Sequence, residues 1–343
     1  MIGMRTNTSW LAAALLLSGC GLGADAAGLG TGDVATESAG VVPANRSASP
    51  GTSAASPTPS TTPSASASST PKASASPAKL ELPRGGTSVF PRYRLVGYAG
   101  LTGSPPLGRL GIGRLGDRVD ELEKRAESYA QGREALPVLE IIATIVQADA
   151  GADGKYRVRS SDADIRRYLK EARAHQALLL LNIQPGRAEF LEEVKAYDKW
   201  LAEPDVGVAL DPEWAMDADQ IPGGAFGHTT GAEIDSVAAH LSRIVAKHDL
   251  PEKVLVYHQL APQIVRKESQ LKKHKGVVLI KSVDGIGSQA AKINTYRQVN
   301  KTTPKFVHPG FKLFLEEDAR EGRLMTPKQV LAIKPKPDYI MYE

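Results

Sequence analysis

The sequence is poor in cysteine, in net charge and in long apolar runs. Cys20 is the only cysteine among 343 residues, which excludes intrachain disulfides and a structural zinc site built from several thiolates. The fold must therefore rest on its hydrophobic core. The net charge is +4, and lysine and arginine are not interleaved with aromatic residues as they are in nucleic-acid-binding proteins. Nucleic acid is not an expected partner.

The N-terminus lacks an apolar run long enough to cross a bilayer as a permanent helix. Arg5 precedes a short apolar segment at residues 11–17, a pattern typical of an export signal. The segment Leu17-Ser18-Gly19-Cys20 resembles the lipobox of bacterial lipoproteins, whose cysteine is acylated and becomes the mature N-terminus. The resemblance implies a signal peptide over residues 1–19, lipidation at Cys20 and a lipid anchor on the extracytoplasmic face of the cell membrane. The alternative is an ordinary signal peptide with an incidental cysteine.

Large apolar side chains are scarce over residues 20–88, which consist mainly of alanine, serine, threonine, proline and glycine. Such a segment cannot offset its ordering entropy, so we expect a disordered tether with an end-to-end span of roughly 45 Å. The folded domain is then expected over residues 89–343.

Apolar runs alternate with amphipathic stretches throughout the folded part, in the pattern of an α/β protein. The eight strand-like runs cover residues 95–98, 137–146, 177–183, 206–210, 253–258, 277–283, 305–308 and 338–342. The helix-like stretches cover residues 117–131, 162–175, 187–202, 231–248, 262–274, 287–299 and 312–333. This alternation predicts a (β/α)8 TIM-like barrel, with an open Rossmann-like sheet as the alternative. An eighth helix is missing, and we expect residues 80–92 to cover its place.

Polar or aromatic residues close each predicted strand, and catalytic groups of such barrels gather at the carboxyl ends of the strands. On this basis we predict that a set of strand-end residues binds substrate: Tyr98, Gln184, Trp214, His258, Gln259, Asp284, His308, Tyr342 and Glu343.

Asp211 and Glu213 follow the fourth strand and are the predicted catalytic pair. Residues two apart on a strand face the same side, which places both carboxyls together. A carboxylic acid beside an aromatic ring such as Trp214 loses hydration, so its pKa rises and it can donate a proton. We therefore predict that Glu213 is the general acid and that Asp211 stabilises positive charge. Alternatively, Pro212 begins a loop and the carboxylates cap a helix or hold an arginine.

The string Gly207-Val208-Ala209-Leu210-Asp211-Pro212-Glu213-Trp214 resembles the fourth-strand signature of family 18 glycoside hydrolases, and family 25 barrels carry a similar acidic pair. Ala209 stands where the family 18 signature has a further aspartate. Segments at 184–187, 211–214 and 310–314 also resemble a family of bacterial secreted proteins and lipoproteins. That second resemblance implies homology across the folded domain without implying an activity.

Two charged residues, Glu140 and Lys281, fall in the middle of predicted strands. They either form a buried ion pair or face outward under the helices.

The sequence thus predicts a monomeric, lipid-anchored barrel that hydrolyses an envelope glycan by acid catalysis without a cofactor. One alternative is a non-catalytic carbohydrate-binding or scaffolding lipoprotein. Another is a metal-dependent hydrolase, in which His258 and His308 join Asp211, Glu213 and Asp284 as ligands. No HExxH motif occurs, and we predict no metal.

Overall fold

Eight parallel strands pair in a ring in residues 79–343, the part of the chain that this computed structural model describes. The strands are β1 (Tyr93–Gly100), β2 (Glu134–Val146), β4 (Leu178–Ile183), β5 (Val206–Leu210), β7 (Lys253–Gln259), β9 (Val277–Val283), β10 (His308–Leu313) and β11 (Tyr339–Tyr342). Each strand pairs with the next one listed, and β11 pairs with β1, which closes the ring. The predicted (β/α)8 barrel is confirmed.

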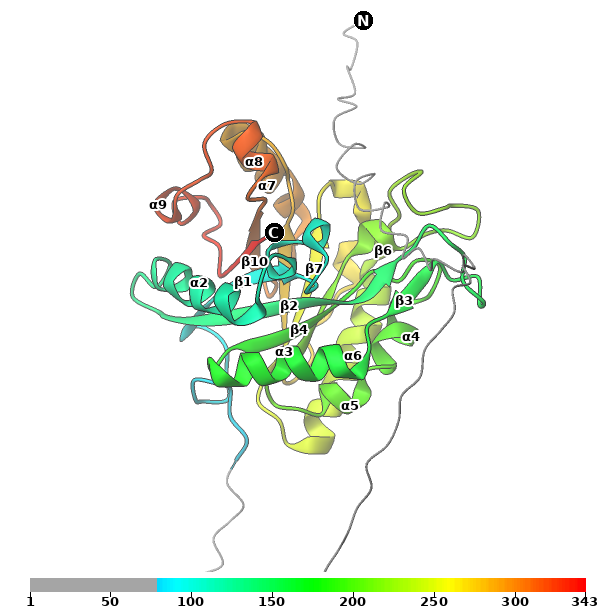
Figure 1. Cartoon of the computed structure of the whole chain (residues 1–343), viewed down its shortest axis with the longest axis horizontal. Helices are drawn as coiled ribbons and strands as arrows, with labels where there is room; N and C mark the ends of the chain where they lie inside the picture. The colour runs from blue at the N-terminus through cyan, green and yellow to red at the C-terminus, as the bar shows by residue number, and fades with distance from the viewer. Residues whose placement is uncertain (1–78) are drawn as a thin grey trace, which may run out of the picture. The chain divides into compact units, whose positions relative to one another are not determined.

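Helices surround the outside of the ring (Figure 1). They are α2 (Leu115–Glu127), α3 (Asp162–Ala174), α4 (Phe190–Lys195), α5 (Asp198–Leu201), α6 (Gly231–His248), α7 (Gln289–Val299), α8 (Glu317–Arg320) and α9 (Pro327–Val330). Ser161, Thr230 and Ser288 cap α3, α6 and α7, because each side chain accepts a backbone N–H of the first turn. Among residues 79–343, no helix is both long and apolar enough to span a membrane.

The helix predicted over residues 262–274 is wrong. This segment forms two 3-10 turns, Pro262–Ile264 and Glu268–Gln270, on either side of the short strand β8 (Val265–Arg266). β8 pairs with β6 (Thr229–Thr230), and Lys267 adopts a left-handed backbone conformation with φ 51° that interrupts any helix. Tertiary pairing overrides the helical pattern of this segment.

The seventh barrel strand lies later in the sequence than predicted. The apolar run at 305–308 precedes β10, which begins at His308 and continues through Pro309 and Gly310 to Leu313. Gly310 is required inside this strand, since a Cβ atom there would lie 2.9 Å from the Lys281 carbonyl oxygen. The Pro-Gly pair therefore marks a close strand contact and not the end of the strand.

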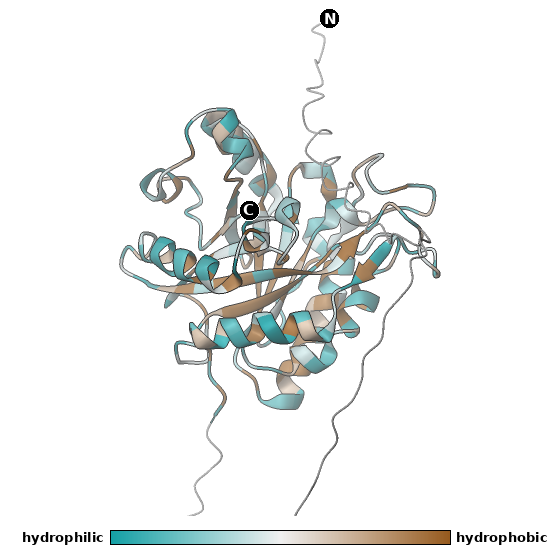
Figure 2. Ribbon diagram, viewed as in Figure 1, coloured by the Kyte–Doolittle hydropathy of each residue, from teal (hydrophilic) through white to brown (hydrophobic). Residues whose placement is uncertain are grey.

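The lower half of the barrel interior, near the amino ends of the strands, is apolar. Alternate residues of the strands point inward and form one cluster, which includes Leu95, Val138, Leu180, Val256 and Ile280. The outward residues form a second cluster with the helices. Figure 2 shows the same division, with hydrophobic strands inside helices whose outer sides are hydrophilic.

Residues 79–92 close the amino-terminal floor of the barrel. Leu82 and Val89 join the interior cluster, and the Arg84 guanidinium donates to the Ala135 carbonyl oxygen at 2.9 Å. Two expectations are corrected here: the segment plugs the barrel instead of replacing a helix, and the domain begins before residue 89. The predicted signal peptide, Cys20 and the rest of the predicted tether lie outside the described residues.

The packing of residues 79–92 can be tested by a stability measurement with a matched control. Leu82 is 3% exposed and Leu80 is 43% exposed. We expect Leu82→Ala to lower the free energy of unfolding by about 2–5 kcal/mol, because it leaves a cavity among interior side chains. Leu80→Ala should change it by less than about 0.5 kcal/mol in the same urea titration. Equal effects of the two variants would contradict the packing of this segment.

Candidate active site

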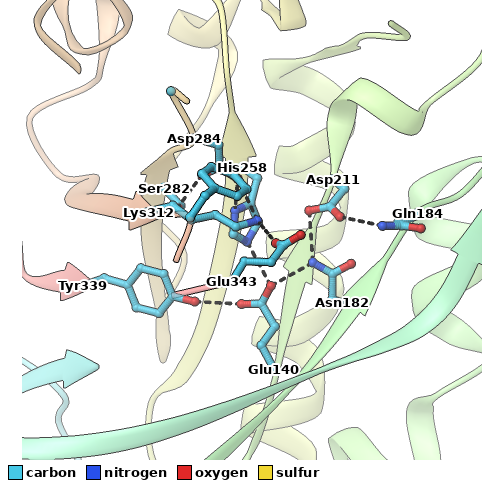
Figure 3. Close-up of polar contacts among 12 residues, drawn as sticks. Glu140, Asn182, Gln184, Asp211, His258, Ser282, Asp284, Lys312, Tyr339 and Glu343 are labelled. Atoms are coloured by element: carbon cyan, nitrogen blue, oxygen red, sulfur yellow. Dashed lines mark hydrogen bonds and ion pairs between the residues drawn. The ribbon is translucent and has the colours of Figure 1, made fainter. Parts of the chain in front are cut away.

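The upper half of the barrel interior, near the carboxyl ends of the strands, is charged. On nearly every strand, the last inward-pointing residue is polar (Figure 3). These residues are Glu140 from β2, Asn182 from β4, Asp211 after β5, His258 from β7, Ser282 from β9, Asp284 directly after β9, Lys312 from β10 and Glu343 after β11.

His258 is held between two carboxylates. Its Nδ1 lies 2.8 Å from Asp284 Oδ2, and its Nε2 lies 3.1 Å from Glu140 Oε1. Burial lowers the pKa of His258, but Asp284 and Glu140 outweigh it and raise the pKa well above its ordinary value. The imidazole is therefore a cation, fully enclosed in the barrel.

Lys312 is the second cation of the site. Its Nζ lies 3.1 Å from Asp284 Oδ2 and 2.6 Å from Glu343 Oε2. Burial opposes the charge, yet Asp284 and Glu343 raise the pKa of Lys312 well above its usual range. The two cations outweigh burial at Asp284 and hold the pKa of its carboxyl well below the usual range.

Two amide side chains hold Asp211. Asn182 Nδ2 donates to Asp211 Oδ1 at 3.0 Å and to Glu140 Oε1 at 2.8 Å. Gln184 Nε2 donates to Asp211 Oδ2 at 3.2 Å, while Gln184 Oε1 accepts the Val146 backbone N–H at 3.2 Å. Burial raises the pKa of Asp211 in spite of the nearby cations.

Glu213 differs from the other carboxyls of the site. It lies on a 3-10 turn, Pro212–Trp214, that starts directly after β5, so the predicted continuation of the strand to Glu213 is wrong. Both Asp211 and Glu213 nevertheless line the same cavity, and neither caps a helix. Glu213 Oε2 is buried, and no group among residues 79–343 donates a hydrogen bond to it. Burial, followed by repulsion from Asp211 and Asp284, raises the pKa of Glu213 to about 8.

A cavity of about 440 Å³ opens above these groups. Its floor is polar, and its walls, from the loops that follow the strands, carry both apolar and charged side chains. The floor contains Asn182, Gln184, Asp211, Glu213, Asp284, Lys312 and Glu343; the walls include the apolar residues Leu107, Trp214, Phe226, Leu260, Ile286 and Phe314 and the charged residues Arg109, Glu316, Glu317 and Arg320. The volume suits a small polar ligand with an apolar flank.

The wall beside Glu213 is fixed by a close backbone contact. The Gly227 N–H donates to the Glu213 carbonyl oxygen at 2.7 Å. A Cβ atom at Gly227 would lie 2.0 Å from the Ala215 carbonyl oxygen, so only glycine fits. This contact places Phe226 against the cavity next to Trp214.

Six of the predicted site residues line the cavity: Asp211, Glu213, Gln184, Trp214, Asp284 and Glu343. Their predicted roles toward substrate remain predictions.

Two predicted tyrosines do not reach the cavity. Tyr98 and Tyr342 occupy outward positions of their strands; Tyr98 donates to Glu121 on α2 at 2.8 Å, and the Tyr342 hydroxyl contacts that of Tyr129 at 2.6 Å. Their predicted role in substrate binding is wrong, because each lies one position out of phase with the inward residues.

Three further predicted substrate-binding residues have structural contacts instead. His258 lies beneath the floor with both ring nitrogens against carboxylates. Gln259 faces outward and donates to the carbonyl oxygens of Ala261 and Pro262. His308 starts β10 at the opposite end of the barrel, where it contacts Asp338 at 2.8 Å and stacks on Phe90. The proposed metal set is therefore not assembled, and Lys312 lies beside Asp284 where its ammonium balances the carboxylates.

The sequence reasoning missed Lys312 because the seventh strand was placed too early. Alternation from Gly310 would have placed Lys312 inward. Glu140 lies in mid-strand as predicted, but its partners are His258, Asn182 and Tyr339 and not Lys281. Lys281 faces outward and pairs with Glu268 at 2.6 Å.

The chain matches no model of a known protein family, and no curated protein matches it. Two solved structures are similar in shape. One is the cellulose synthase subunit Z from Clostridioides difficile, with 10% identity, a TM-score of 0.40, and coverage of 74% of this chain and 92% of that one. The other is the Streptomyces plicatus N-acetyl-beta-hexosaminidase, with 10% identity, a TM-score of 0.32, and coverage of 73% and 58%. Likeness at this level carries no argument about activity.

The raised pKa of Glu213 predicts a cost in stability. The folded pKa of about 8 exceeds the unfolded value of about 4.3, so the folded state binds more protons and stability falls as pH rises between the two. We expect Glu213→Gln to be more stable than wild type, with a gain that grows from about pH 4.5 to about pH 8 and then levels. Urea titrations across this range measure it. The exposed control Glu321→Gln should show no such trend, and a pH-independent difference for Glu213→Gln would contradict the assignment.

Proposed function

We propose that this barrel is a glycoside hydrolase of the cell envelope in which Glu213 is the general acid. The observation that carries the proposal is a buried carboxyl with a raised pKa and without a hydrogen-bond donor on Oε2 among residues 79–343, lining a cavity at the carboxyl ends of the strands. General acids need a pKa near the working pH, which this site supplies through burial and like charge.

Acid catalysis at this site has a direct physical basis. Glu213 donates its proton to the glycosidic oxygen as the bond to the anomeric carbon breaks. Asp211, held rigid by Asn182 and Gln184, stabilises the positive charge that develops on the sugar. Trp214 and Phe226 supply apolar surface for the sugar ring.

The cavity argues against acyl transfer through a side-chain nucleophile. Within residues 79–343, its lining includes no serine, cysteine or histidine. Lys312 is a protonated ammonium held by two carboxylates, which makes it a poor nucleophile. Carboxyl and amide groups dominate the polar floor, as a glycosidase requires.

The location of the enzyme is part of the proposal. Lipidation at Cys20 would anchor the chain to the membrane, and the low-complexity segment after it would let the barrel reach glycan some tens of ångströms away.

Removing the acid tests the catalytic role. We expect wild type to release reducing ends from purified peptidoglycan, and Glu213→Gln to be slower by about 10²–10⁴-fold, because the leaving oxygen then departs without a proton. Glu321→Gln is the matched control on an exposed helix end. Equal release by wild type and Glu213→Gln rules out Glu213 as the acid. Ligand binding without any release by wild type favours the carbohydrate-binding alternative.

The pH profile offers a second test. Only protonated Glu213 can donate, so kcat/KM for glycan hydrolysis should fall as pH rises above about 8. A profile that rises through this pH would contradict the role of Glu213 as a proton donor.

Anchoring is tested separately in cells. Cys20→Ser should move the protein from the membrane fraction to the soluble extracytoplasmic fraction and abolish labelling with a palmitate analogue. Unchanged membrane association of Cys20→Ser would contradict the lipid anchor and leave the catalytic proposal intact.

A further inference from the structure

We infer that Glu343 is the second catalytic carboxylate and acts as a general base on water, so that hydrolysis inverts the anomeric centre. The inference rests on the proposed function and names the partner of Glu213.

Four other carboxyls lie at or near the strand ends, and three of them are held by other side chains; Glu316 and Glu317 line the cavity from the segment that follows β10. Glu140 contacts His258, Asn182 and Tyr339. Asp284 contacts His258, Lys312 and Ser282, and its side chain is 5% exposed. Asp211 accepts from an amide on each oxygen.

Glu343 is the most accessible of these four strand-end carboxyls. Its side chain is 20% exposed and lines the cavity. Among the described residues, Lys312 forms an ion pair with Glu343 Oε2. Burial raises the pKa of Glu343 above its ordinary value while Lys312 opposes that shift, so the carboxylate is more basic than one in water.

The backbone fixes where Glu343 points. Its N–H donates to the Leu313 carbonyl oxygen at 2.9 Å, and its carbonyl oxygen accepts the Leu315 N–H at 2.9 Å. Gly108 leaves room for the side chain, because a Cβ atom there would lie 2.9 Å from Glu343 Cγ. The carboxylate is thus held against the loop that follows β1.

Glu213 and Glu343 belong to opposite sides of the ring. In the order β1, β2, β4, β5, β7, β9, β10, β11, the two residues follow the fourth and the eighth strands. The two carboxyls therefore enter the cavity from different sides. In an inverting enzyme one carboxyl protonates the leaving oxygen while the other activates water on the opposite face of the sugar, and this placement suits that division of roles.

The proposed step balances in atoms and charge. Glu343 takes a proton from water as the water oxygen bonds to the anomeric carbon, and the bond from that carbon to the glycosidic oxygen breaks. Glu213 gives its proton to the departing oxygen. The protons on the two carboxyls then exchange with solvent.

Leaving-group dependence separates the two roles. The probes are phenyl and 2,4-dinitrophenyl glycosides of the sugar that wild type releases from peptidoglycan. Glu213→Gln should lose about 10²–10⁴-fold on the phenyl glycoside and far less on the dinitrophenyl glycoside, whose leaving group needs no proton. Glu343→Gln should lose a similar factor on both, since water activation is needed in each case. Glu321→Gln should match wild type.

Product stereochemistry and azide provide readouts that a structural role would not change. The first anomer seen by proton NMR should be opposite to that of the substrate. Azide attacks without a base, so it should restore turnover of the dinitrophenyl glycoside by Glu343→Gln and give the inverted glycosyl azide.

Several results would overturn the inference. A first product with retained configuration, full activity of Glu343→Gln, or a Glu343→Gln loss confined to the phenyl glycoside would each do so while leaving Glu213 as the acid. Wild type that releases no sugar from peptidoglycan would remove the proposed function and this inference together.

Discussion

The charged upper half of the barrel depends on the two contacts that the His258 imidazolium makes with Glu140 and Asp284. Three buried charges far from water are tolerable only because each faces an opposite charge at hydrogen-bonding distance. The contacts continue from Asp284 to Lys312 and on to Glu343, so the chain of charges joins strands β2, β7, β9, β10 and β11 across the interior. Loss of His258 would leave the buried Glu140 carboxylate without a cation in contact with it among the described residues.

The same network gives the carboxyls of the site different pKa values. Asp284 faces two cations, which lower its pKa, whereas Glu213 faces Asp211 and Asp284, which raise its pKa to about 8. Five carboxyls lie at or near the strand ends, and His258 and Lys312 are the cations beside them there, while Arg109 and Arg320 line the cavity from the loops. Protonation of the least compensated carboxyl relieves the excess negative charge. Two acids of similar chemistry thereby acquire different protonation states within one cavity.

The sequence predicted the barrel well because buried parallel strands are continuous apolar runs and helices have a different period. It also located Asp211, Glu213 and Glu343 at strand ends. The prediction was wrong where it depended on which residues of a strand point into the barrel. Tyr98 and Ala99 are neighbours, yet Tyr98 faces α2 and Ala99 faces the interior. The prediction was wrong again at β10, where Pro309 and Gly310 resemble a turn but pair with β9 and β11. Which carboxyl finds a cation depends on distances across the ring, and a linear pattern holds no information about them.

Compensation of charge distinguishes structural groups from the candidate catalytic group. Glu140, Asp284 and Lys312 each have partners that offset the cost of burial, and these contacts account for their presence without any reaction. Glu213 has no donor on Oε2 within the described residues and its carboxyl is destabilised when ionised, so folding alone gives no reason for a carboxyl there. The presence of a group that lowers stability and lines a cavity is best explained by its action on a ligand that binds in that cavity. Burial, together with repulsion from Asp211 and Asp284, raises the pKa of that one carboxyl.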